Sequence, residues 1–316
     1  MMTFVIRRAM QMIPVIVGVT LATFLLTQII PGDAAGVLLG PGASEEARLE
    51  LRRALGFDRS LHVQYFIYLE HLAGGDLGQS ISFFQPVSKV LADRLANTAL
   101  LAVTATVLAS VVGVAIGTWA ALKPGSLRDH GLTVAVLFLN SMPSFWLGLV
   151  FILIFGLNLR LLPVSGMYST FGGGGLLDLV RHMVLPTVTL AAWSLAVIAR
   201  MTRSSLLDVI NSDYIRTARS RGLSETRIVF RHALPNALPA VITVIGMQMG
   251  FLLSGAVLTE TVFSWPGIGL AMYQAISARD IPLIQGGILL IAVIFVVINF
   301  VVDVLYACFN PKIRLA

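Results

Sequence analysis

The chain is poor in cysteine, in lysine and in charged residues as a whole. One of its 316 residues is cysteine, so no disulfide can form within the chain. Charged residues make up 12% of the sequence, about half of what an ordinary soluble domain carries, while hydrophobic residues make up 57%. This balance argues against a soluble globular domain and indicates a protein whose main solvent is the lipid bilayer.

Six stretches of the chain contain no aspartate, glutamate, lysine or arginine. A membrane-spanning helix needs about 20 largely apolar residues, although about 17 can be enough. Five of the stretches reach about 20 residues, and the sixth reaches about 17. The sequence therefore predicts an all-α membrane protein with six transmembrane helices. In chain order, these stretches are Ala9–Ile30, Leu95–Leu122, Gly131–Leu159, Met183–Ala199, Ala233–Thr259 and Ile281–Val302.

The distribution of basic residues predicts the orientation in the membrane. Arginine and lysine gather in the short loops that remain on the cytoplasmic side. Seven arginines lie between residues 200 and 235, whereas the two short loops on the other side hold three basic residues in total, Arg160, Arg181 and Arg279. The first stretch is too long for the roughly 7–15-residue core of a cleaved signal peptide, so we expect it to stay as an anchor. Both termini are then cytoplasmic. The net charge of +6 reflects this bias, and we expect no nucleic-acid partner.

The usual catalytic and energy-coupling motifs are missing. A phosphate-binding loop ends in Gly-Lys-Ser/Thr, but the three lysines follow Ser, Leu and Pro. The five histidines fall in predicted loops or at helix ends, and none stand at metal-ligand spacing on a helix. The predicted spans lack the mid-membrane charges that proton-driven carriers use. We therefore predict no catalytic residue, metal site or cofactor. The alternatives are a passive channel, a sodium-coupled carrier, or a pore subunit driven by a partner.

A basic loop, residues 200–235, separates the fourth and fifth predicted spans. Within it the stretch DYIRTARSRG, Asp213–Gly222, predicts a short helix of about two to three turns. Ser212 is suited to cap its first turn. Gly222 is suited to end the helix, because helices often stop at a left-handed residue.

The predicted helix has a small apolar face made of Tyr214, Ile215 and Ala218. Its arginines are expected to lie on the solvent-exposed sides of the helix. Charge alone fits a loop that touches anionic lipid. The small residue at Ala218 and the compact apolar face also fit a helix that fills a groove in a partner protein.

The basic loop resembles the cytoplasmic loop of the membrane subunits of ABC importers. The pattern of that family is Glu-Ala-Ala, three residues, Gly, nine residues, Ile, one residue and Leu-Pro. The positions that match it are Ala218, Gly222, Leu234 and Pro235. The positions that depart from it, at the glutamate, the first alanine and the isoleucine, are Arg216, Thr217 and His232. These departures are typical of one branch, the dipeptide/oligopeptide/nickel importer permeases.

Members of that branch resemble nearly the whole chain. The similar segments include IIPGD, GDLGQS, DYIRTARSRGLS, RHALPNALP, ETVFSWPGIG, RDIPLIQGG and NPKIR. The resemblance implies the transmembrane domain of a type I ABC importer in a bacterial inner membrane, with a structured extracytoplasmic loop after the first helix. The implied divisions are residues 1–30 (first helix), 31–97 (loop with amphipathic helices), 98–308 (five-helix core) and 309–316 (cytoplasmic tail).

The resemblance also implies partners. A second homologous permease subunit would supply the other half of the translocation path, and an extracytoplasmic substrate-binding protein would deliver the cargo. Two ATPase subunits would hold ATP and Mg²⁺, so this chain would be neither an enzyme nor a cofactor carrier. The implied cargo is a peptide, with glutathione or nickel chelates as alternatives. The residues implied to couple to the ATPases are Asp213, Tyr214, Ile215, Arg216, Thr217, Ala218, Arg219 and Gly222, with Leu234 and Pro235 ending the loop.

Two further motifs leave alternatives open. The segment ETVFSWPGIG follows the fifth predicted span and fits either an interfacial aromatic belt or a re-entrant gate facing the binding protein. Pro143, inside the third span, fits either a packing kink or a pore-lining role. The candidate residues for the outer gate or binding-protein side are Glu260, Trp265, Pro266, Gly267 and Gly269.

Overall fold

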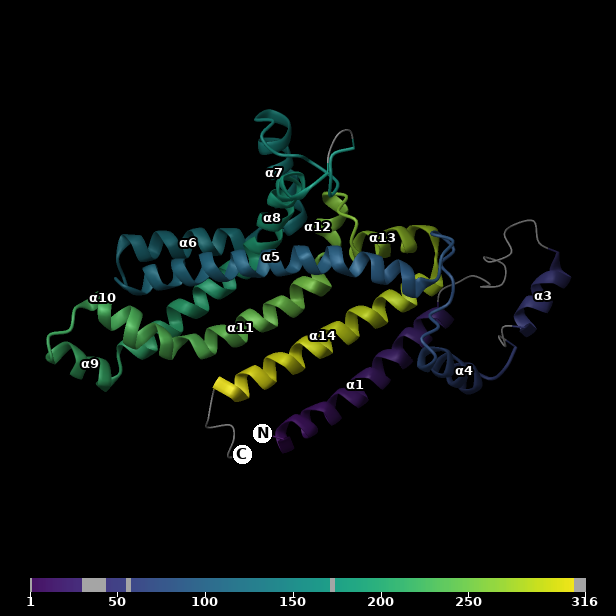
Figure 1. The fold of residues 1–316 in the computed structure, drawn as a ribbon, viewed down its shortest axis with the longest axis horizontal. Helices are drawn as coiled ribbons and strands as arrows, with labels where there is room; N and C mark the ends of the chain where they lie inside the picture. Colours follow the sequence, from purple (N-terminus) through teal and green to yellow (C-terminus); the bar gives the residue numbers. More distant parts are fainter. Residues whose placement is uncertain (1, 30–43, 55–57, 171–173, 310–316) are drawn as a thin grey trace.

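The computed structural model describes residues 2–29, 44–54, 58–170 and 174–309. Within these ranges every regular element is a helix, and an isolated antiparallel bridge joins Gln79 to Pro86. The prediction of an all-α fold is confirmed. The helices form an elongated bundle in which several long helices run side by side (Figure 1).

Five helices are long and apolar enough to cross a membrane. They are α1 (Met2–Ile29), α5 (Val87–Ala121), α8 (Leu176–Ile210), α11 (Leu234–Gly255) and α14 (Ile281–Phe309). The described part of the chain has a sixth crossing if a bent pair counts as one span. The pair consists of α6 (Leu127–Ser141) and α7 (Ser144–Phe151), with α7 continuing as the π-helix η1 (Ile152–Asn158).

Helix α8 lies at the centre of the bundle, where it packs against α5, α6, α7 and α11. Glycines on α5 let the two backbones approach closely. A Cβ atom at Gly117 would overlap the carbonyl oxygen of Ala199, and one at Gly113 would lie 3.0 Å from the carbonyl oxygen of Leu195. Such small residues are common where membrane helices pack. By contrast, α1 packs mainly against α14 at the edge of the bundle.

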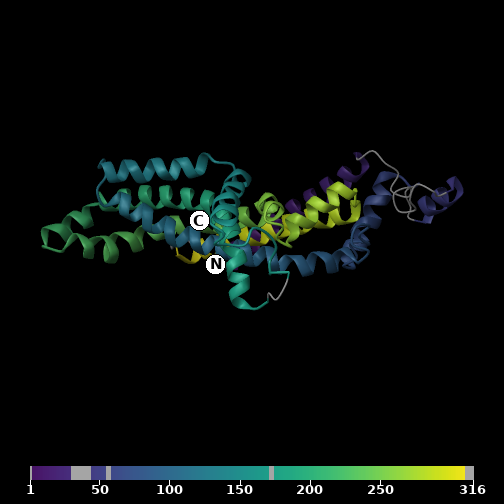
Figure 2. The same ribbon diagram turned by 90° about the horizontal axis from the view of Figure 1, so that it is seen from above.

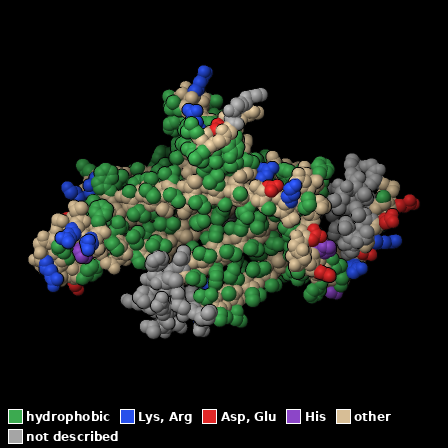
Figure 3. Space-filling view, viewed as in Figure 1, with side chains coloured by type: hydrophobic (Ala, Val, Ile, Leu, Met, Phe, Trp, Pro, Cys, Tyr) green, Lys and Arg blue, Asp and Glu red, His purple; other side chains and the backbone are tan. Residues whose placement is uncertain are grey.

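Short helices lie at both ends of the bundle (Figures 1 and 2). One end, which we call the basic end, carries α9 (Asp213–Ser220), α10 (Glu225–Arg227) and the π-helix η2 (Ile228–Ala233). The opposite end carries α3 (Glu45–Ala54), α4 (Leu61–Ala73) and α13 (Ile268–Ala278). Hydrophobic side chains cover the middle of the visible face, and charged side chains gather at its ends and at the tip above α7 (Figure 3). This pattern is expected of a bundle that spans a bilayer.

Two sequence-based boundaries need correction. The stretch from Pro86 to Arg94 was assigned to the loop with amphipathic helices, residues 31–97, and not to the second span. Instead it forms the first turns of α5, because no helix-breaking residue follows Pro86. The third span was expected to be a single kinked helix. It is broken at Met142 and Pro143, where α6 and α7 meet at 100°. This bend is much sharper than a packing kink.

Candidate functional site

Helix α9 occupies Asp213–Ser220, the first eight residues of the predicted motif Asp213–Gly222. Ser212 holds the extended backbone of an N-cap, but its side chain makes no capping hydrogen bond. Its hydroxyl instead donates to the Val209 carbonyl over 2.5 Å. Gly222 has a φ of +79°, and its N–H donates to the Arg219 carbonyl over 2.9 Å. The predicted left-handed glycine is confirmed, whereas the predicted Ser212 side-chain cap is wrong.

The apolar face of α9 points into its own subunit. Ile215 is fully buried, and Ala218 packs at the edge of the same hydrophobic cluster. The wall of the cluster is supplied by Ala121, Leu206, Ile228, Val229, Ala233 and Ala237. The burial of Ile215 corrects the prediction that this residue faces a partner, whereas Ala218 keeps part of its surface exposed and its role stays a prediction. Helix η2 folds back beneath α9 and fills the position that a partner groove was expected to occupy.

The opposite side of α9 is exposed and polar, apart from one aromatic ring. The Tyr214 side chain is 47% exposed. Thr217 and Arg221, which follow it by three and seven residues, are also exposed. Residues with this spacing share one helix face. Arg219 forms a two-pronged ion pair with Glu225, with N–O distances of 2.7 and 3.2 Å. This hydrogen-bonded pair raises the pKa of Arg219 and ties α9 to the start of α10.

The other predicted residues of the loop occupy three kinds of position. Asp213 and Arg216 are exposed and 3.6 Å apart, a surface pair of the kind that contributes little to stability. Leu234 packs against the cluster beneath α9. Pro235 lies in the first turn of α11, directly after the π-helix η2.

A buried ion pair lies where α8 leaves the bundle. Both guanidinium nitrogens of Arg203 that face Asp129 lie 2.7 Å from its carboxylate oxygens, and Asp129 is almost completely buried. The Gly125 N–H donates to the same carboxylate over 2.9 Å. The pair holds the start of α6 against α8. Sequence reasoning missed it, because only opposite charges 74 residues apart hint at the contact.

At the opposite end, the ETVFSWPGIG segment is wound around the carboxylate of Glu260. This residue lies in α12 (Val257–Val262) and is fully buried. The Thr98 hydroxyl donates to it over 2.7 Å, and the Leu270 N–H donates over 3.1 Å. A Cβ atom at Gly267 would overlap the carboxylate, and one at Gly269 would lie 2.9 Å from it. Both glycines are therefore required by the close approach of the backbone to Glu260.

The same segment is fixed to α5 by its tryptophan and proline. The Trp265 indole donates to the Asn97 carbonyl over 3.0 Å, and the Asn97 amide donates to the Pro266 carbonyl over 2.9 Å. Trp265 is fully buried. It therefore belongs neither to an interfacial aromatic belt nor to a surface that touches a binding protein. Burial excludes direct partner contact in this conformation for Glu260, Gly267 and Gly269 as well.

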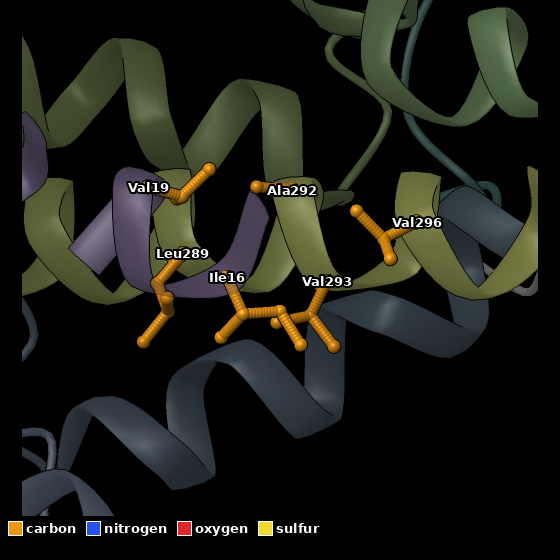
Figure 4. Close-up of a pocket in the computed structure, with 6 residues that line it drawn as sticks. All are labelled: Ile16, Val19, Leu289, Ala292, Val293 and Val296. Atoms are coloured by element: carbon orange, nitrogen blue, oxygen red, sulfur yellow. The ribbon is translucent and has the colours of Figure 1, made fainter. Parts of the chain in front are cut away.

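The interior of the bundle offers little that could hold a metal. Among the described residues, no group of three His, Cys, Asp or Glu side chains could bind an ion. One buried polar pair joins α8 to α11, where the Gln248 amide donates to the Ser194 hydroxyl over 3.2 Å. A small hollow between α1 and α14 is lined by aliphatic side chains alone (Figure 4). Its lining residues are Ile16, Val19, Leu289, Ala292, Val293 and Val296.

A bundle of membrane-spanning helices with a helical loop between its fourth and fifth spans has the fold of the transmembrane domain of a type I ABC importer. Among solved structures, one titled as inward-facing conformations of the MetNI methionine ABC transporter superimposes with a TM-score of 0.56. The match covers 70% of this chain and 96% of that one at 20% sequence identity. The predicted fold class is thereby confirmed.

The chain belongs to the family described as binding-protein-dependent transport system inner membrane component, which matches residues 113–315. The N-terminal part of such components matches residues 1–102. The chain is 45% identical to a di/tripeptide transport system permease protein DppB of Pseudomonas aeruginosa and 41% identical to the dipeptide permease DppB of Escherichia coli K12. It is also 41% identical to a glutathione transport system permease protein GsiC of Salmonella choleraesuis. Each of these comparisons covers 99% of both chains.

Proposed function

We propose that this subunit forms half of a translocation path for short peptides, driven by ATP hydrolysis on two partner ATPases. The supporting observation is full-length similarity to dipeptide permeases, together with a helix in the basic loop that exposes one face. A second homologous permease supplies the other half of the path, and a binding protein brings the peptide. ATP and Mg²⁺ bind to the ATPases, so this chain needs no cofactor of its own.

Helix α9 couples the ATPase to the membrane spans through two faces, one that contacts the ATPase and one that packs against this subunit. The exposed face with Tyr214 and Thr217 fits into the ATPase, while Ile215 locks the helix to η2 and to the end of α8. Because Arg219 and Glu225 close the loop on the far side, α9 moves together with its surroundings. A displacement of the ATPase is thus transmitted to α8 and α11, the two spans that the loop connects. The exposed arginines keep α9 out of the bilayer and rim the contact.

We infer that the basic end is cytoplasmic. Seven arginines in the basic loop satisfy the positive-inside rule. Arg8, near the start of α1, pairs with Asp303, near the end of α14, over 2.6 Å, so both termini lie on one side of the bundle. Cysteines introduced at Ser220 and Ser44 test this in a Cys308→Ser background. An impermeant thiol reagent should label position 44 and spare position 220 in intact cells, and the reverse pattern would overturn the orientation.

The Glu260 segment serves as a positioning element for an outer gate. Its hydrogen bonds join the end of α12 and the start of α13 to α5, and the Gly166 N–H donates to the Phe263 carbonyl over 2.8 Å. The helices α5, α12 and α13 and the loop before α8 therefore meet here. A movement of α11 pulls on this junction and opens or closes the outer side of the path.

Glutathione is the alternative cargo, because a relative of equal coverage is a glutathione permease. Nickel chelates are a further alternative within the same machinery. A self-sufficient channel or ion-coupled carrier is disfavoured by membership in a binding-protein-dependent family.

Reconstitution of the four kinds of subunit in proteoliposomes tests the proposal. A labelled dipeptide should enter only with ATP and the binding protein, and glutathione should compete weakly. Uptake by this chain alone would refute the proposal, and preferential uptake of glutathione would select the alternative cargo.

A further inference from the structure

A short hairpin, residues 78–86, precedes α5 and is not used by the mechanism above. The Ser80 N–H donates to the Gln85 carbonyl over 2.9 Å, and the Phe84 N–H donates to the Ser80 carbonyl over 3.1 Å. Gln79 and Pro86 close the hairpin as an antiparallel bridge. We call it the Phe84 hairpin. Its internal bonds help to fix the course of the backbone around Phe84.

Asp280 fastens this hairpin to the start of α14. Its fully buried carboxylate accepts the Ser80 hydroxyl over 2.5 Å and the Ser82 N–H over 2.9 Å. The Leu283 N–H, in the first turn of α14, donates to it over 3.2 Å. Hydrogen bonds to a charged carboxylate are stronger than those between neutral groups, so these three bonds hold the hairpin and the start of α14 together. The hairpin is therefore a fixed part of the bundle.

The two phenylalanines of the hairpin have opposite environments. Phe83 packs against the cluster that joins α5, α13 and α14, and the guanidinium of Arg94 lies 5.3 Å from its ring centroid. Phe84 is 88% exposed and has a φ of +52°. A bulky residue in the left-handed region is a genuine outlier. Such strain persists only where the surrounding structure imposes it, and it concentrates at functional sites.

The position of the hairpin along α5 places Phe84 beyond the lipid tails. The charged residues Lys89, Asp93 and Arg94 separate it from the charge-free stretch that starts at Leu95. From Val87 to Arg94 the helix rises about 10 Å. Charged side chains are rare on the lipid-facing surface of a span, and near its ends they reach toward the interface. The Phe84 ring is therefore held in the water-facing layer, where the surface of a soluble partner can cover it.

We propose that Phe84 is the anchor on which the substrate-binding protein docks. This inference rests on the proposed function and assigns one contact within it. A partner permease packs beside the spans, whereas a binding protein arrives from the water above this end. Lys89 in the first turn of α5 and Arg279 next to Asp280 are exposed cations on the elements that hold the hairpin, so we expect the matching surface to be an apolar pocket with an acidic rim. Aromatic anchors of this kind dominate the binding energy of protein interfaces.

The variant Phe84→Asn tests the anchor, because asparagine tolerates a positive φ and leaves the hairpin backbone unstrained. The complete importer in nanodiscs is titrated with its binding protein while ATP hydrolysis is measured. We expect the half-maximal concentration of binding protein to rise at least tenfold, which corresponds to about 1.4 kcal/mol. The maximal rate should stay unchanged. The matched control is Phe66→Asn, which removes an exposed ring of α4 (68% exposed) and should shift the titration less than twofold.

A photoreactive phenylalanine analogue at position 84 identifies what covers the ring. Cross-linking to the binding protein supports the proposal. Cross-linking only to lipid, to the second permease or to residues 30–43 of this chain would overturn it, and so would a normal titration for Phe84→Asn. Those outcomes leave the proposed function intact. The proposed function fails separately, if the wild-type importer shows no ATP hydrolysis that depends on the binding protein.

Discussion

The orientation of α9 gives a pair of substitutions with opposite expected effects. Ile215→Ala removes a fully buried side chain from the cluster beneath the helix. A buried isoleucine-to-alanine change costs about 3 kcal/mol, since the cavity is only partly refilled. This corresponds to an increase on the order of 100-fold in the population with α9 detached. Thr217→Trp adds bulk on the exposed side, where this chain offers no obstacle.

Hydrogen exchange of the loop amides and copurification of the ATPases separate the two effects. Ile215→Ala should speed exchange across α9 and η2 and uncouple ATP hydrolysis from transport. Thr217→Trp should leave exchange unchanged but weaken ATPase capture about tenfold, because overpacking a tight contact costs about 1–3 kcal/mol. Normal exchange in Ile215→Ala, combined with normal ATPase capture in Thr217→Trp, would refute this assignment of the two faces of α9.

Three further substitutions test other parts of the structure. Asp129→Asn should destabilise the detergent-solubilised subunit by about 2 kcal/mol in a melting or denaturant assay, because the partly exposed Arg203 loses its carboxylate partner; Asp208→Asn, which removes an exposed carboxylate, serves as the control. Gly222→Val should reduce transport strongly with normal membrane insertion, since a β-branched residue resists a φ of +79°, and full transport would contradict this. Gly267→Ala should lower both expression and transport, because the added methyl meets the Glu260 carboxylate; a fully active variant would show that this junction is loose.

Hydrophobic runs and charge gaps were sufficient to predict the fold. Each charge-free stretch lies within or largely overlaps a helix or the broken pair of the structure. The broken third span was not predicted, because a proline in a membrane helix is compatible with a mild kink as well as with a 100° bend. The extension of α5 was missed for a related reason. A change from amphipathic to fully apolar composition resembles the boundary between two helices, although the backbone continues through it.

The candidate site was predicted in its place but not in its orientation. Gly222 and the position of α9 followed from local rules of helix termination. The burial of Ile215 depends on η2, which reaches α9 only through the tertiary fold. The same limitation applies to Glu260, whose partners Thr98 and Leu270 lie on different helices. Propensity and spacing describe one segment at a time, so they cannot show which neighbour covers it.

The most direct test of the account is the accessibility of Tyr214 in the assembled importer. In a Cys308→Ser background, Tyr214→Cys is labelled with a soluble thiol reagent before and after addition of the ATPases, with Ile215→Cys as the buried control. We predict rapid labelling of position 214 in the permease pair alone, at least tenfold slower labelling in the full complex, and slow labelling of position 215 in both. Unchanged labelling of position 214 on assembly would contradict the claim that α9 couples this subunit to the ATPases.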